Sequence, residues 1–144
     1  MSVAQGRDIE ADLVDALRRE GAVLLSALAE LDGQVIGHIL FSRMWVDSAE
    51  AVALAPLAVA PDFQRQGVGG ELIRYGLERL RGGGERIVIV AGHPDYYPRF
   101  GFSSEKAFSI KSPFPREAFM ALELSAGALD GIRGWARYAA SFGL

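Results

Sequence analysis

Residues 61–72, PDFQRQGVGGEL, place three glycines in the predicted connection between a strand and the helix that follows it. Glycine costs about 0.5–1 kcal/mol relative to alanine inside regular structure, so this cluster requires a physical reason. No Ser, Thr, Asp or Asn immediately precedes the helix to cap it, and its first N–H groups therefore lack an acceptor. Because the helix dipole adds partial positive charge, we expect residues 66–70 to bind a phosphate or pyrophosphate. The alternative is a tight turn in which glycine only permits close packing.

Two better-known phosphate-binding loops are excluded by their spacing. A P-loop requires Lys and then Ser or Thr after its last glycine, but Glu71 follows Gly70. A dinucleotide fingerprint requires a glycine where Leu72 stands. A nucleotide-binding domain that holds a different pyrophosphate is still an alternative, although the segment 91–93, AGH, lacks its expected acidic ribose-binding residue.

The elements around the glycines predict a mixed α/β fold. The apolar run 51–60, the amphipathic helix ending at the glycines 82–84, and the apolar run 86–92 form a βαβ unit with parallel strands. Pro56 lies in the first strand and cannot donate to a ladder, so that strand is an edge strand or parts from its neighbour there.

The rest of the chain adds elements on both sides of this unit. A short helix through Ile9, Leu13, Val14 and Leu17 ends at Gly21, and Asp32-Gly33 between two β-rich runs predicts a hairpin. The segments FSI and AFMALEL predict further strands around a loop with Pro113 and Pro115. We expect one domain over residues 1–144.

Composition limits the classes of partner. The chain has 144 residues, half of them hydrophobic, and a net charge of −3 without a basic run, so nucleic acid is a poor candidate partner. It has no cysteine, which excludes disulfides, thiolate metal ligands and a cysteine nucleophile, and we assign no metal ligands. No apolar run reaches about 18 residues and no signal segment is recognisable. We therefore expect no membrane partner and a cytoplasmic location.

Two motifs resemble those of the GNAT N-acetyltransferase superfamily. Gln64-x-x-Gly67-x-Gly69, after LAVAPDF, resembles its acyl-CoA motif, and YYPRFGF at 96–102 resembles its Tyr-x-x-x-Gly-Phe element. The segment 112–124, SPFPREAFMALEL, resembles the C-terminal half of a branch of small predicted acetyltransferases, so the resemblance covers roughly residues 9–138.

This resemblance implies a GNAT-like fold and transfer of an acetyl group from acetyl-CoA to a primary amine of a small molecule or peptide. The strand Leu57, Ala58 and Val59 would pair with the pantetheine arm. Backbone amides of the loop would hold the CoA pyrophosphate, and we assign the loop residues Gln64, Arg65, Gln66, Gly67, Val68, Gly69 and Gly70 to cofactor binding. The alternative is a module of the same fold that senses acyl-CoA without turning it over.

The expected chemistry needs a proton for the departing thiolate. Tyr97 stands at the motif's tyrosine position, and a tyrosine with a pKa near 10 suits a leaving group of comparable basicity, so Tyr97 is the candidate general acid. The alternative is an aromatic that packs beside Phe100 and Phe102. A backbone N–H near Val59 could polarise the carbonyl. The weaker candidates for a general base are His38, His93 and Asp95. A water relay or an amine that is already neutral would make a general base unnecessary.

The N-terminus departs from the family's pattern. Such domains usually begin with a strand and a longer helical region, and here the first strand is apparently missing, which puts acceptor recognition in doubt. A strand edge left open invites pairing, so a second subunit could complete it as a homodimer. The sequence does not identify the acceptor substrate. The aromatic residues Phe114 and Phe119 could overhang the acceptor site or belong to the core.

Overall fold

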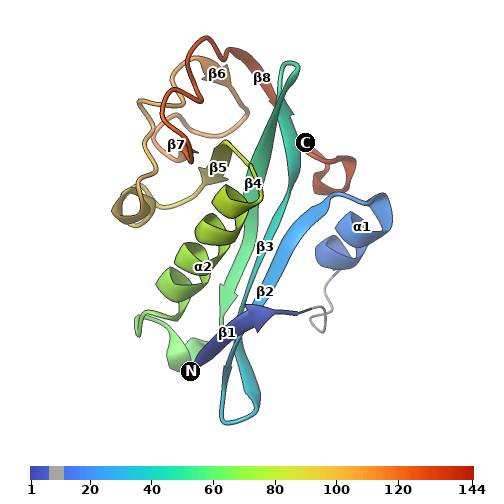
Figure 1. The fold of residues 1–144 in the computed structure, drawn as a ribbon, viewed down its shortest axis with the longest axis vertical. Helices are drawn as coiled ribbons and strands as arrows, with labels where there is room; N and C mark the ends of the chain where they lie inside the picture. The colour runs from blue at the N-terminus through green and yellow to red at the C-terminus, as the bar shows by residue number, and fades with distance from the viewer. Residues whose placement is uncertain (7–11) are drawn as a thin grey trace.

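The computed structural model describes residues 1–6 and 12–144 (Figure 1). It contains two α-helices, eight strands and three short 3-10 turns, η1 to η3, in these described residues. In chain order the elements are β1 Ser2–Gln5, α1 Asp12–Glu20, β2 Val23–Leu31, β3 Gln34–Val46, β4 Ala49–Val59, η1 Pro61–Phe63, α2 Val68–Gly82, β5 Ile87–Ala91, η2 Tyr97–Phe100, β6 Ile110–Lys111, β7 Phe119–Glu123, β8 Gly134–Arg137 and η3 Ala140–Phe142.

The strands of the described residues form one mixed sheet. Its order is β1-β2-β3-β4-β5-β7, and β8 pairs with the end of β3 and with β6. The β2–β3 hairpin turns at Asp32 and Gly33, whose φ angles of 53° and 79° suit the left-handed conformation that a two-residue turn requires. The predicted hairpin is therefore confirmed.

The prediction that the first strand is missing is wrong. β1 pairs antiparallel with β2, from Ser2 opposite Glu30 to Gln5 opposite Ala27. Its only half-buried residue is Val3, so it has no hydrophobic alternation that the sequence could reveal. The expectation of a partner subunit rested on an open edge at this position, and β1 removes that reason.

The predicted N-terminal helix is present as α1. Val14 and Leu17 are fully buried, and Gly21 follows the helix with a φ of +78°. The helix packs on Leu40 of β3 together with residues of the C-terminal turn η3. Ile9, which belongs to the predicted helix face, lies outside the described residues.

The sheet separates two apolar layers. Helix α2 covers one face, where its residues Leu72 and Ile73 pack with Phe41. Neighbouring residues of β3 point the other way: Leu40 contacts α1, while Met44 packs with the C-terminal segment around Phe119. Figure 1 shows α2 lying along the sheet and α1 beside the start of β2. No helix among the described residues is long and apolar enough to cross a membrane.

The predicted βαβ unit is β4–α2–β5, and its strands are parallel. Within the described residues, β4 and β5 pair only at Val52 with Val88 and at Ala53 with Ile89. β4 then continues through Pro56 to Val59 while it stays paired with β3. β4 and β5 therefore part after Ala53, near Pro56 as predicted, and the edge of β4 that turns away from β3 is open over its last residues.

The C-terminal aromatics belong to the core. Phe119 is fully buried, and Phe114 stacks on it with ring centroids 6.4 Å apart. Both lie in the apolar layer on the face opposite α2, so neither overhangs the glycine loop.

Candidate functional site

The unpaired end of β4, the glycine loop, the first turns of α2 and η2 enclose a cavity of about 750 Å³. This volume falls within the range of small-molecule sites. We call it the loop cavity. Its lining residues are Leu57, Val59, Phe63, Gln64, Arg65, Gly67, Val68, Gly69, Gly70, Arg74, His93, Tyr96, Arg99 and Phe100.

The three glycines at the start of α2 have separate physical reasons. Gly67 is the N-cap residue, with a φ of 87°, and no side chain caps the helix. A Cβ on Gly69 would lie 2.8 Å from the Tyr96 hydroxyl, and a Cβ on Gly70 would lie 3.2 Å from Nη1 of Arg74. One glycine therefore supplies a left-handed turn, and the other two admit side chains from the cavity walls. The uncapped first turn leaves N–H groups for an anion.

The structure brings together most of the residues predicted to bind the cofactor. Ala58 and Gln66 are outside the cavity lining, while the other predicted cofactor-binding residues line it. Ala58 is exposed between two lining residues of β4, as strand alternation requires. The Gln66 side chain instead donates to the Asp62 carbonyl at 3.0 Å, and the Gln64 side chain donates to the Val59 carbonyl at 3.1 Å. The Gln64 bond connects the loop to the end of β4, and the Gln66 bond connects it to η1.

Tyr96 and Tyr97 occupy different depths. Tyr96 lines the loop cavity, whereas Tyr97 is 9% exposed and packs edge-on against Tyr96 and Phe102, at centroid distances of 5.1 Å and 5.9 Å. The Tyr97 ring also lies against Gly92, where a Cβ would meet it at 2.4 Å. Burial raises the pKa of both hydroxyls, although Arg99 and Arg74 oppose this for Tyr96. Both are therefore protonated donors at neutral pH.

The loop cavity is positively charged. Arg65, Arg74 and Arg99 line it, and no carboxylate is among the lining residues. Sequence reasoning missed Arg74, Arg99 and Tyr96. Arg74 stands on the polar side of α2 and Arg99 inside the YYPRFGF motif, so a signal existed, but their convergence depends on how η2 packs against α2.

The three candidate general bases lie in different places. His93 lines the loop cavity, while Asp95 does not. His38 is 3% exposed, and its Nε2 lies 3.0 Å from the Ser26 hydroxyl. Burial, with a smaller contribution from Arg18, lowers the pKa of His38, so its imidazole is neutral at pH 7.

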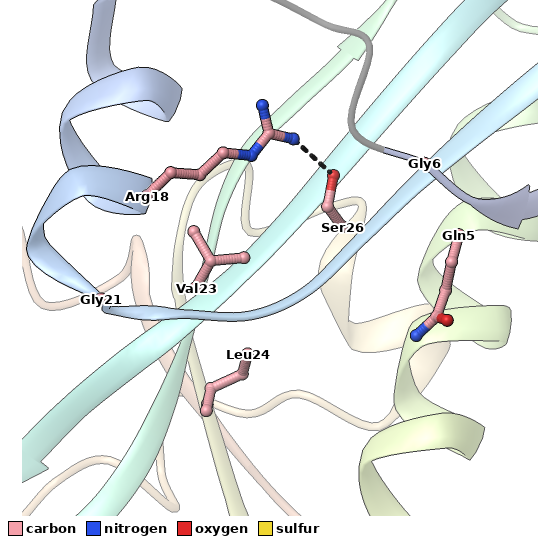
Figure 2. A pocket seen from close by; sticks show the side chains of 7 residues that line it. All are labelled: Gln5, Gly6, Arg18, Gly21, Val23, Leu24 and Ser26. Atoms are coloured by element: carbon pink, nitrogen blue, oxygen red, sulfur yellow. Dashed lines mark hydrogen bonds between the residues drawn. The ribbon is translucent and has the colours of Figure 1, made fainter.

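A second cavity of about 340 Å³ lies beside this buried polar pair (Figure 2). Figure 2 shows the Arg18 guanidinium reaching from α1 toward Ser26 on β2, with an Nη2 to Oγ distance of 3.5 Å. β1 contributes Gln5, and the residue after it, Gly6, also lines the cavity. None of its lining residues belongs to the loop cavity, and His38 itself lines neither of the two cavities.

The fold and the loop cavity define an α/β protein in which the uncapped start of a helix opens beside two parallel strands that part. The acetyltransferase (GNAT) family model matches residues 4–102, and the chain belongs to this family.

Relatives and solved structures agree with this assignment. The uncharacterized N-acetyltransferase YjhQ of Escherichia coli K12 is 45% identical over 123 residues, covering 79% of this chain and 68% of the relative. The crystal structure of the GNAT family N-acetyltransferase YhbS from Escherichia coli in complex with CoA has a TM-score of 0.85 and 34% identity, and covers 92% of this chain and 76% of that chain. A GNAT family acetyltransferase from Brucella melitensis in complex with acetyl-CoA has a TM-score of 0.80 and 33% identity, with coverage of 98% and 97%.

Proposed function

We propose that residues 1–144 act as one GNAT domain that transfers an acetyl group from acetyl-CoA to a primary amine of a small molecule or peptide. The observation that carries this proposal is the loop cavity, in which the unpaired edge of β4 and the uncapped start of α2 meet. The CoA and acetyl-CoA complexes of the two similar structures support it.

The cavity walls suit the parts of acetyl-CoA. Free N–H groups at the start of α2 and in the loop would donate hydrogen bonds to the diphosphate oxygens, with the helix dipole adding to the attraction. The open edge of β4 from Leu57 to Val59, apart from the Val59 carbonyl that Gln64 bonds, offers backbone groups to the amides of the pantetheine arm, as a neighbouring strand would. These are the cofactor-binding roles that we propose for the predicted residues.

The reaction joins the acceptor nitrogen to the carbonyl carbon of the thioester and breaks the carbon–sulfur bond. A neutral amine supplies the electron pair, and the proton it loses passes to water. We propose that Tyr97 donates a proton to the departing thiolate, because it stands at the motif's tyrosine position and burial keeps its hydroxyl protonated. Its ring contacts the cavity-lining Tyr96 edge-on at 5.1 Å, and water returns the proton to the tyrosinate. A backbone N–H near Val59 would polarise the carbonyl oxygen.

Ligand-dependent thermal unfolding tests the proposal. A ligand at a hundredfold its dissociation constant stabilises the folded state by about 2.7 kcal/mol, which corresponds to a shift of several degrees in a domain of this size. We expect acetyl-CoA and CoA to raise the midpoint and NAD to leave it unchanged. Equal shifts with NAD, or no shift with the CoA ligands, would contradict the proposal. A screen of amines for release of the free CoA thiol then identifies the acceptor.

The burial of Tyr97 also favours a second candidate, an acyl-CoA sensor of the same fold. In that case Tyr97 packs in the core and donates no proton. The sensor predicts the same thermal shift but no release of CoA thiol with any amine above the rate of thioester hydrolysis. Thiol release that depends on amine concentration excludes it.

A further inference from the structure

Two arginines in the loop cavity have no role in the proposed mechanism. Arg74 extends from α2. Its guanidinium turns back toward the start of the helix, where Nη1 lies 3.2 Å from the position that a Cβ on Gly70 would take. Arg99 extends from η2 on the facing wall. Both side chains belong to exposed residues, so a ligand can reach them.

Aromatic rings hold both guanidinium groups. Arg74 lies over the Phe100 ring at 5.2 Å, and Arg99 lies over the Tyr96 ring at 5.5 Å. The two rings contact each other edge-on, with centroids 5.3 Å apart. Stacking on a ring restricts the rotamers of an arginine while leaving its N–H edge available. The two cations are therefore preorganised on one rigid aromatic pair.

The nearest carboxylate does not neutralise this cluster. Glu71 lies 3.8 Å from Arg74, and both side chains are more than half exposed, at 57% and 65%. An exposed ion pair with this separation contributes little and is readily displaced. In a chain with a net charge of −3, the loop cavity thus presents cations in excess.

The geometry points to Arg74 and Arg99 as the residues that select coenzyme A bearing its 3′-phosphate over the 3′-dephospho form. This inference rests on the proposed use of acetyl-CoA. Backbone N–H groups of the glycine loop serve the diphosphate and need no side-chain cation. The terminal phosphomonoester carries up to two negative charges, and planar guanidinium groups bind such a group through paired hydrogen bonds.

The test compares dissociation constants of acetyl-CoA and 3′-dephospho-acetyl-CoA by isothermal titration calorimetry. Hydrogen bonds to charged groups imply a preference of about 10- to 100-fold for acetyl-CoA in the unmodified protein. Arg74→Gln and Arg99→Gln should each weaken acetyl-CoA and leave the dephospho form nearly unchanged, so the preference falls. A displacement of Tyr96 or Phe100 in a variant would change the dissociation constants of both ligands equally, so the ratio of the two constants would stay the same.

Arg79→Gln is the matched control. Arg79 also lies on α2 and over an aromatic ring, 5.2 Å from the centroid of Tyr75, but it does not line the loop cavity. It should keep the full preference for acetyl-CoA.

The outcomes separate this inference from the proposed function. Equal affinities of the unmodified protein for both ligands would overturn the inference and leave acetyl-CoA binding intact. Equal weakening of both ligands in the arginine variants would instead place the guanidinium groups on the diphosphate and also overturn it. Failure of the unmodified protein to bind either ligand would refute the proposed function itself.

Discussion

Gly76, in the middle of α2, should be a packing position that tolerates no side chain. A Cβ on this residue would lie 2.1 Å from Cε2 and 2.5 Å from Cζ of Phe41. Phe41 is fully buried on β3 and belongs to the same apolar layer as α2, so its ring has no free space into which it can retreat. The variant Gly76→Ala therefore forces α2 and β3 apart.

The magnitude follows from two opposing terms. Alanine gains about 1 kcal/mol over glycine in a helix interior, whereas overpacking a tight core costs typically about 1–3 kcal/mol. Because the contact is far inside van der Waals distance and its partner is immobile, we expect the upper part of that range. The net loss is about 1–2 kcal/mol, which corresponds to a decrease of about 3–8 °C in the unfolding midpoint.

Thermal unfolding of Gly76→Ala beside Gly69→Ala gives the comparison. A Cβ on Gly69 would meet the Tyr96 hydroxyl and, at 3.8 Å, the side chains of Leu57 and Val59, so it would point into the loop cavity. The end of a tyrosine side chain can shift, and Gly69→Ala should keep its midpoint within about 1 °C. It should instead weaken acetyl-CoA binding about tenfold. An unchanged or raised midpoint for Gly76→Ala would refute the packing argument.

Three further predictions concern the site and the stability of the fold. The variant Tyr97→Phe should lower turnover at least tenfold and leave the affinity for acetyl-CoA near normal. The control Tyr96→Phe should weaken that affinity and keep turnover at saturating acetyl-CoA. Full turnover of Tyr97→Phe in steady-state kinetics would contradict the role of Tyr97 as general acid. Arg43 and Glu85 form a bidentate, largely buried pair at 2.9 Å and 2.6 Å, so Arg43→Met should lower the free energy of unfolding in urea by about 1.5–3 kcal/mol, and a change within error would count against the pair. The pKa of His38 is lowered in the folded state, so the unfolded chain binds more protons at acidic pH. The free energy of unfolding should therefore fall as the pH drops below about 6.5. Urea midpoints measured between pH 7 and pH 5 should show this decrease, and the variant His38→Asn should reduce it.

Local patterns in the sequence predicted the elements nearest the site. Asp32-Gly33 predicted its turn because both residues adopt left-handed conformations at low cost, and Pro56 predicted the parting of β4 because it lacks a backbone donor. The glycine loop predicted an uncapped helix start, and the structure has one. Each of these features depends on residues within a few positions of one another.

The strand β1 was not predictable in this way. Four residues with one half-buried side chain lack a recognisable period, and their conformation comes from hydrogen bonds to β2, more than twenty residues away in the chain. Likewise, His38 read as a residue facing a cleft or solvent, but packing on its face of the sheet buries it against Ser26.

The sequence by itself determined the family, the position of the glycine loop and the order of strands and helices around it, because these follow from backbone preferences and short-range periodicity. Only the tertiary structure decided which side chains surround the loop. Arg74 and Tyr96 belong to separate elements, and they meet because α2 and η2 both pack beside the open edge of β4. Such convergence depends on packing between distant segments, which no local pattern encodes.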